Sequence, residues 1–314
     1  MIIVLGSTNT DLVIRGPCLP APGETVLGGE FYRAHGGKGA NQAVAAARAS
    51  GKPVTFIAAV GDDPFGRDAL DHFANENLDI RFLKTVPGQP SGVALILVDD
   101  HGENLISVAS GANEHLLPAD VHAVPDEVFR GADVLLTCLE SPLETVAGGL
   151  QRAKEAGLRT ILNPAPANEA ILQHGLLELT DVLTPNEGEA AALAGIETKN
   201  SAAAARLREL GCKSCAITLG DRGCLVVDEQ GVETRIEGHP VHAVDATAAG
   251  DAFNGALAVA LSEARPLVEA ARFANRAAAI AVTRPGAQPS LPTRAEIDEA
   301  APGLSQFSVF GKPD

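Results

Sequence analysis

Residues 244–255 read V-D-A-T-A-A-G-D-A-F-N-G, a run of small residues followed directly by a helical pattern. This stretch predicts a helix that begins near Gly250. The first N–H groups of a helix have no partner within it, and small side chains let an anion approach them closely. Residues 248–250 therefore predict an anion site, with Asp251 beside it in the first helical turn. The alternative is that Asp251 only caps the helix, because Asp is favoured near helix starts.

On either side of this stretch, short apolar runs alternate with Ala-rich segments of helical period. The alternation implies an α/β fold, a three-layer sandwich with a mostly parallel central sheet and helices on both faces. Strands are predicted at residues 2–5, 54–60, 134–138, 160–162, 182–183 and 215–219. Helices are predicted at residues 40–50, 65–75, 143–156, 186–193, 202–210, 251–262 and 267–282.

Two stretches in the first third of the chain break this alternation. Residues 11–34 contain segments of period 2, and residues 92–98 and 104–109 flank D-D-H-G, which is a hairpin signal. Together they predict a small antiparallel sheet, formed by roughly residues 11–35 and 91–110. Next to a binding cleft such a sheet would serve as a lid. We expect residues 1–314 to form one domain that carries this lid.

The charge balance narrows the classes of partner. The formal net charge of −16 argues against sequence-independent nucleic-acid binding, which needs Lys and Arg to neutralise phosphates, and against docking on anionic membranes. No apolar run is long enough to span a membrane. The N-terminus enters a strand pattern with no basic region ahead of it, so we expect a cytoplasmic protein without a signal peptide.

Five cysteines include the lone C-x-x-C of residues 212–215. This motif could be redox-active or form half of a zinc site. The count is odd and no second pair lies at metal-ligand spacing. We expect packed, inert thiols in a reducing compartment.

Residues 35–42 read H-G-G-K-G-A-N-Q and precede an Ala-rich helical pattern. They do not form a Walker A phosphate loop, because that loop needs Ser or Thr after its Lys, and Lys38 is followed by Gly39. They predict a tight turn whose backbone and Asn41 amide bind neutral hydroxyl groups, with residues 36–37 as a hinge. A flexible loop is the alternative.

Two further loops follow predicted strands, where open α/β sheets bind ligands. In T-P-N-E-G-E, residues 184–189, Asn186 and Glu189 share one helix face and could meet nucleotide phosphates and a hydrated magnesium ion. A capping box is the alternative there. The other loop is T-L-G-D-R-G, residues 218–223, for which an ordinary hairpin turn is the alternative.

The order of these segments resembles the ribokinase/phosphofructokinase-B family of carbohydrate kinases, over about residues 2–297. H-G-G-K-G-A-N-Q-A-V-A-A is similar to the first family signature and D-A-T-A-A-G-D-A-F-N-G to the second. L-E-S-P-L-E, N-P-A-P-A, T-P-N-E-G-E and A-V-T-R-P-G-A-Q-P-S resemble the ribokinase branch of the family more than its other branches.

The resemblance implies an enzyme that phosphorylates a small sugar with ATP, foremost D-ribose at O5, and forms a homodimer through the lid. It implies that Asp251 is the general base and that Ala248, Ala249 and Gly250 form an anion hole. The implied sugar contacts are Asn9, Asp11, Gly36, Gly37, Lys38, Gly39, Asn41, Glu140 and Asp251. The implied nucleotide contacts are Asn186, Thr218, Leu219, Gly220, Asp221, Arg222, Gly223, Gly250 and Asn275.

The resemblance also implies two metal ions. Glu189 would hold Mg²⁺ through water. The K⁺ positions, largely backbone carbonyls, are Asp245, Thr247, Ala281, Arg284, Gly286 and Ser290.

The sequence departs from the family pattern where Ala246 and Ala252 replace Thr, and where Asn275 stands in place of the His of some relatives. The acceptor is also open. Asn9 and Asp11 favour a polyhydroxyl sugar, but deoxyribose, another pentose or hexose, or a nucleoside would use the same chemistry. A non-enzymatic sugar sensor is a third possibility, against which the intact Asp251 and Glu189 argue.

Overall fold

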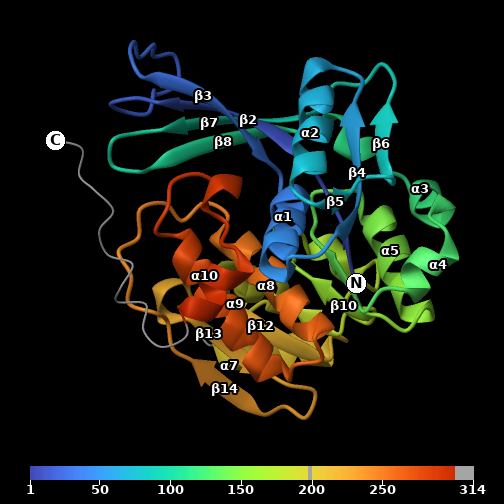
Figure 1. Cartoon of the computed structure of the whole chain (residues 1–314). Coiled ribbons are helices and arrows are strands. Elements are labelled where there is room, and N and C mark those ends of the chain that lie inside the picture. Colours follow the sequence, from blue (N-terminus) through green and yellow to red (C-terminus); the bar gives the residue numbers. More distant parts are fainter. Residues whose placement is uncertain (197–199, 301–314) are drawn as a thin grey trace.

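The computed structural model describes residues 1–196 and 200–300 and contains two β-sheets (Figure 1). The larger sheet has ten strands in the order β14-β13-β12-β11-β10-β9-β1-β4-β5, and β6 also pairs with β4. Its strands pair in parallel, except that β13 is antiparallel to both β12 and β14. The strands are β1 (Ile2–Leu5), β4 (Val54–Gly61), β5 (Leu78–Asp79), β6 (Leu83–Val86), β9 (Val134–Thr137), β10 (Arg159–Leu162), β11 (Val182–Leu183), β12 (Ser214–Thr218), β13 (Cys224–Val227) and β14 (Glu233–Ile236).

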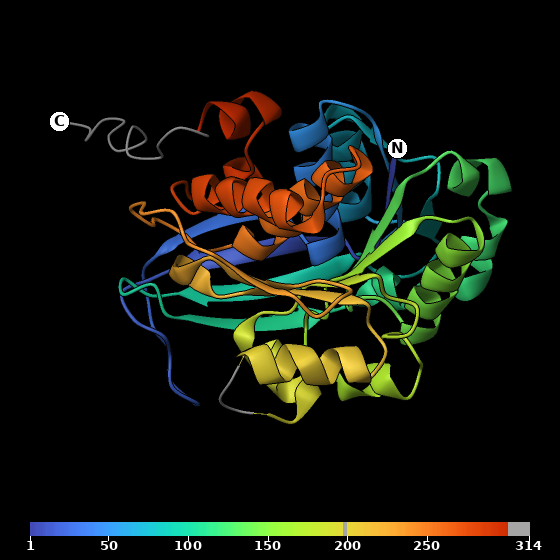
Figure 2. The same cartoon turned by 90° about the horizontal axis from the view of Figure 1, so that it is seen from below.

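Helices cover both faces of the large sheet, as Figure 2 shows edge-on. Each face buries its own apolar cluster, because the strands are apolar on both sides. One face carries α1 (Lys38–Ser50), α2 (Pro64–Asn75), α8 (Ala249–Ser262), α9 (Leu267–Ala281) and α10 (Arg294–Glu299). The other carries α3 (Pro118–Ala123), α4 (Asp126–Arg130), α5 (Leu143–Glu155), α6 (Glu187–Ala194) and α7 (Asn200–Glu209). The predicted fold class is confirmed.

The smaller sheet projects beside the helices α1 and α2 and has the order β3-β2-β7-β8 (Figure 1). Its strands are β2 (Asn9–Arg15), β3 (Glu30–Gly36), β7 (Gly92–Val98) and β8 (Asn104–Ala109). The predicted hairpin of residues 92–98 and 104–109 is confirmed, but the sheet is not antiparallel throughout, because β2 and β7 pair in parallel. The chain between them passes through β3, α1, β4 and α2, and so long a crossover allows the two strands to run in the same direction.

The predicted strands and helices of the central layers agree with the observed ones to within two residues at each end. The hairpin β13–β14 and the short helices α3, α4 and α10 were not predicted. They are too short for a helical or alternating pattern to stand out. The predicted domain range of 1–314 includes residues 197–199 and 301–314, which lie outside the described part of the chain.

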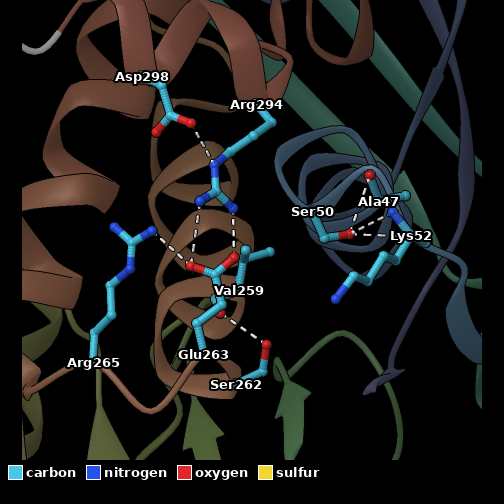
Figure 3. Close-up of polar contacts among 9 residues, drawn as sticks. All are labelled: Ala47, Ser50, Lys52, Val259, Ser262, Glu263, Arg265, Arg294 and Asp298. Atoms are coloured by element: carbon cyan, nitrogen blue, oxygen red, sulfur yellow. Dashed lines mark hydrogen bonds and ion pairs between the residues drawn. The ribbon is translucent and has the colours of Figure 1, made fainter.

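The end of α8 is tied to α10 by ion pairs (Figure 3). Glu263 follows the last turn of α8 and pairs with both Arg265 and Arg294. Arg294 also donates to Asp298 on its own helix, at 2.8 Å. These contacts join α10 to the end of α8, and the short turn η4 (Gln288–Ser290) precedes α10 in the chain.

The predictions about membrane spans and about the C-x-x-C motif can be compared with the structure. Within residues 1–196 and 200–300, no helix combines the length and the apolar character needed to cross a membrane. Cys212 and Cys215 are buried free thiols whose Sγ atoms lie 3.4 Å apart. The hydrogen bond between Cys215 and Cys212, together with burial, raises the pKa of Cys215 well above its ordinary value.

Candidate active site

A cavity of about 220 Å³ lies beyond the carboxyl ends of the central parallel strands. The loops after β10, β11 and β12 and the starts of α1, α6 and α8 line it, which is where ligands bind in open α/β sheets. Its lining residues are Lys38, Asn163, Ala165, Thr184, Asn186, Glu189, Thr218, Ala246, Ala248, Ala249, Gly250, Asp251 and Asn254.

Asp251 lies in the first turn of α8 and is only 6% exposed. Its two carboxylate oxygens accept hydrogen bonds from Asn41 Nδ2 and Gln42 Nε2, each at 3.0 Å. Burial raises the pKa of Asp251 to about 6, against the opposing effects of Lys38 and the two amides. At neutral pH the group is therefore ionised, yet basic enough to accept a proton.

The start of α8 is open toward the cavity. Ala248, the N-cap, has a left-handed backbone with φ 60°, which costs free energy for a residue with a Cβ and is concentrated at functional sites. A Cβ added to Gly250 would meet nothing within 4 Å. An anion can therefore approach the backbone of Gly250 without displacing protein atoms.

Acidic side chains from the small sheet and from the loop after β9 gather beside Asp251. Burial, together with the negative charges of Glu140 and Asp251, raises the pKa of Asp11 to about 7. A Cβ on Gly36 would lie 2.2 Å from Asp11 Oδ2, so only glycine leaves room for that carboxylate.

Glu140, in the loop after β9, is the other acidic side chain of this group beside Asp251, and we call the region around Asp11 and Glu140 the acidic corner. Its Oε2 accepts from Ser7 Oγ at 2.6 Å and from the backbone N of Lys38 at 2.9 Å. Burial lowers the pKa of Lys38, but Asp251 and Glu140 outweigh it, so the net shift is upward and the ammonium stays charged.

The other predicted sugar-side residues lie around this corner. Asn9 is buried, and its Oδ1 accepts from Asn113 Nδ2 at 2.9 Å. Gly37 is the N-cap of α1 with φ 88°, and a Cβ there would lie 2.7 Å from the N of Asn9. Gly39 lies on the first turn of α1, against Ser7.

Asn186 and Glu189 form a capping box at the start of α6. Asn186 Oδ1 accepts from the N of Glu189, and Glu189 Oε2 accepts from the N of Asn186, both at 2.8 Å. The capping alternative is thus confirmed, but both side chains also line the cavity together with Thr218. Burial raises the pKa of Glu189.

Residues Gly220–Arg222 form the turn η3, which joins the antiparallel strands β12 and β13. The hairpin alternative for this loop is confirmed as local structure. Leu219 is buried in the apolar core, whereas Asp221 and Arg222 are exposed and Arg222 forms an ion pair with Glu187. Gly223 has φ 85°, and a Cβ there would lie 2.1 Å from Ile236 O.

Asn275 lies on α9 outside the cavity lining. Its Nδ2 donates to Glu237 O at 2.9 Å.

The two loops predicted to hold K⁺ lie against one another. Asp245 Oδ1 accepts from Thr247 N and Oδ2 accepts from Gly286 N, both at 2.8 Å. Burial raises the pKa of Asp245, but these hydrogen bonds outweigh it and hold the pKa below its ordinary value. Ser290 Oγ donates to Ala287 O at 2.7 Å.

Ala281 and Arg284 complete this region, where the N of Arg284 donates to Ala281 O. In the described ranges no group of three or more His, Cys, Asp or Glu side chains is clustered closely enough to hold a metal ion.

A polar network under the cavity was missed by the sequence analysis. Gln42 Nε2 donates to Asn163 Oδ1 at 3.0 Å, and Asn163 Nδ2 donates to Thr184 O at 2.9 Å. Thr184 Oγ1 donates to Asn254 Oδ1 at 2.6 Å, and Asn254 Nδ2 donates to Gly250 O at 2.8 Å. Asn163 and Thr184 directly follow β10 and β11, so the strand-end rule could have singled them out.

The chain matches the model of the pfkB family carbohydrate kinases over residues 1–294 and belongs to that family. Among its relatives, the ribokinase of Haemophilus influenzae is 44% identical over 95% of this chain and 97% of that protein. The deoxyribokinase of Salmonella typhi is 33% identical over 95% of this chain and 97% of its own length.

Solved structures agree with the family. The ribokinase of Thermotoga maritima has a TM-score of 0.85 at 38% identity, covering 95% of this chain and 98% of that one. The ribokinase of Arabidopsis thaliana, complexed with ribose and ATP, has a TM-score of 0.83 at 29% identity, covering 95% and 97%.

Proposed function

We propose that the protein transfers the γ-phosphoryl group of ATP to the 5-hydroxyl of D-ribose, giving D-ribose 5-phosphate and ADP. The observation that carries the proposal is the position of Asp251, a buried carboxylate between the acidic corner and the start of α8. Ribose and ATP as substrates are supported by ribokinases that match at 44% and 38% identity over nearly the whole chain, and by the Arabidopsis thaliana ribokinase, whose structure is complexed with ribose and ATP.

In this mechanism Asp251 accepts the proton of the sugar hydroxyl as the bond to the γ-phosphorus forms. Below about pH 6 the carboxylate is mostly protonated and cannot accept it, because the pKa of Asp251 is about 6. The hydroxyl is held in place by the loop of residues 36–41 and by Asn9, Asp11 and Glu140.

Charge on the transferred group is stabilised at the start of α8. The helix N-terminus carries a partial positive charge, and the open space at Gly250 lets phosphoryl oxygens approach it. Lys38, which is charged and lines the same cavity, adds a positive group.

The residues in and beside the cavity also offer positions for the two implied metal ions. Mg²⁺ prefers oxygen ligands and retains several waters, and the carboxylate of Glu189 with the amide of Asn186 offers such a wall beside the phosphates. A bound Mg²⁺ would neutralise phosphate charge. K⁺ would be held mainly by backbone carbonyls of the loops of Asp245 and Gly286, which adjoin through the hydrogen bond from Gly286 N to Asp245 Oδ2, and it would order the backbone that leads into α8.

The small sheet serves as the lid that keeps water from competing with the sugar. One face of the sheet exposes large apolar side chains, namely Ile14, Phe31, Leu95 and Leu105, which the strand register places on the same side. An exposed apolar patch of this kind is typical of an interaction surface and supports a homodimer through the lid. Light scattering tests the dimer.

A second candidate keeps the chemistry and changes the acceptor to deoxyribose, another pentose or hexose, or a nucleoside. The 33% identity to a deoxyribokinase favours deoxyribose among these. The third candidate, a sugar sensor without turnover, is disfavoured by the placement of Asp251 and Glu189 in one cavity.

ADP release measured on a panel of these acceptors separates the three candidates. The proposal predicts the highest kcat/KM for D-ribose. A higher kcat/KM for another acceptor, or no preference for ribose, would favour the second candidate, and no turnover with any acceptor would favour the sensor.

A further inference from the structure

Four side chains from distant parts of the chain form a continuous hydrogen-bonded series that ends at Asp251. His72 Nε2 lies 2.6 Å from Gln288 Oε1, Gln288 Nε2 donates to Asn41 Oδ1 at 3.1 Å, and Asn41 Nδ2 donates to Asp251 Oδ2 at 3.0 Å. His72 is on α2, Gln288 on η4, Asn41 on α1 and Asp251 on α8. The series therefore connects four separate elements.

The acceptor at its end fixes the direction of the whole series. An ionised carboxylate only accepts hydrogen bonds, so Asn41 must present its NH₂ group to Asp251. Its Oδ1 then needs a donor, and among the described residues the NH₂ group of Gln288 provides it. Gln288 Oε1 in turn needs a donor, so His72 carries a proton on Nε2. Bonds that all run in one direction polarise and strengthen one another.

Gln288 is held firmly at the centre of this series. Its side chain is 2% exposed. Arg48, two turns after Asn41 on α1, donates from Nη1 to Gln288 O at 2.7 Å and to Leu291 O at 3.1 Å. Arg48 is itself paired with Glu76 through two hydrogen bonds.

His72 is also confined. The ring of His35 stacks on it with centroids 4.0 Å apart and planes 5° from parallel. Asp68, Arg33 and Glu76 are the charged groups beside this pair.

We propose that Gln288 is a positioning residue, which holds the amide of Asn41 in the one orientation that donates to Asp251. The proposal rests on the proposed role of Asp251 as the base. Without Gln288, Asn41 can rotate and turn its oxygen toward the carboxylate. The carboxylate then loses a donor that aims it and favours its ionised form. Because Gln288 lies between Gly286 and Ser290, the order of that loop is also transmitted to the base.

Two substitutions test the direction of the series. Gln288→Met removes both hydrogen bonds at similar size, and we expect kcat to fall about tenfold with the acidic midpoint of the kcat–pH profile moved to higher pH. Gln288→Glu still accepts from His72 but cannot donate to Asn41, so Asn41 turns to donate to Glu and presents its oxygen to Asp251. We expect a larger fall, about a hundredfold, and a larger shift of the midpoint. KM for ATP changes less than about twofold in both.

The matched control is Gln151→Met on the exposed face of α5. We expect it to leave kcat and the acidic midpoint of the kcat–pH profile unchanged. Should Gln288→Met not fold, as judged by circular dichroism, His72 gives the same test. His72→Gln keeps a donor for Gln288 and retains activity, whereas His72→Leu lowers kcat and raises the midpoint.

If Gln288→Met kept the wild-type kcat and midpoint while Asp251→Asn was inactive, the role of Gln288 would be overturned. The role of Asp251 as the base would still stand. The proposal would also be overturned if Gln288→Met and Gln288→Glu lost kcat equally, with no shift of the midpoint. Such a loss would indicate only local unfolding. Activity retained in Asp251→Asn would instead contradict the proposed function itself.

Discussion

Asn41 Nδ2 lies 3.0 Å from Asp251 Oδ2, although the two residues are 210 positions apart in the chain. The contact brings together the two glycine-containing stretches, one at the start of α1 and the other at the start of α8. It depends on close packing of those helices, because a Cβ at Gly255 on α8 would lie 2.5 Å from Ala45 Cβ and 2.7 Å from Ala46 N. The approach of two backbones thus places the amide on the carboxylate.

Gly255→Ala should therefore destabilise the protein. The added methyl group meets backbone of α1, which cannot move aside without separating the helices, and we expect a loss of about 1–3 kcal/mol in the free energy of unfolding. Denaturant unfolding measures it. The control is Gly148→Ala on α5, where the nearest atom to the added Cβ is 3.8 Å away. An equal loss in both variants would contradict the packing argument.

Gly250→Ala should separate activity from stability. The added Cβ meets no protein atom within 4 Å, so the melting temperature should stay the same or rise slightly. The methyl group does fill the space through which phosphoryl oxygens approach the helix, and we expect kcat/KM for ATP to fall about tenfold or more. Unchanged kinetics would show that the anion does not bind at this helix start.

The acidic limb of the kcat/KM–pH profile, which reports groups of the free enzyme, should have its midpoint near pH 6, because burial raises the pKa of Asp251 to about 6 and the protonated group is inactive. The negative charge of Glu140 raises the pKa of Asp251. Glu140→Gln removes that charge, so the midpoint should move to lower pH. Glu144→Gln, on the exposed surface of α5, should leave it unchanged. A midpoint that rises in Glu140→Gln would contradict this electrostatic account.

Potassium should activate the enzyme. Replacing K⁺ by Na⁺ or Tris is expected to lower kcat by about fivefold to a hundredfold, the usual range for coupling between a site and an effector. Asp245→Ala breaks the link between the loops of Thr247 and Gly286, and should abolish the difference between K⁺ and Tris. Equal rates of the wild type in K⁺ and in Tris would refute the cation proposal.

The sequence predicted the features that depend on local pattern. Buried strands such as Val182–Leu183 are apolar runs, and the glycines around Lys38 and the small residues before Asp251 leave a visible signature. It could not show that β2 and β7 pair in parallel, because strand direction depends on the path of the chain between them. It also missed Gln288, whose hydrogen bonds to Asn41 and His72 span more than two hundred positions and leave no periodic trace.

Steady-state release of ADP by the wild type and by Asp251→Asn, with D-ribose and Mg-ATP in K⁺ buffer, tests the central claim most directly. Asn keeps the size and the hydrogen-bonding reach of Asp251 but cannot accept a proton. We expect kcat to fall by about a hundredfold to ten-thousandfold while the melting temperature is retained. An Asp251→Asn variant that turns over ribose within about twofold of the wild-type rate would contradict the account.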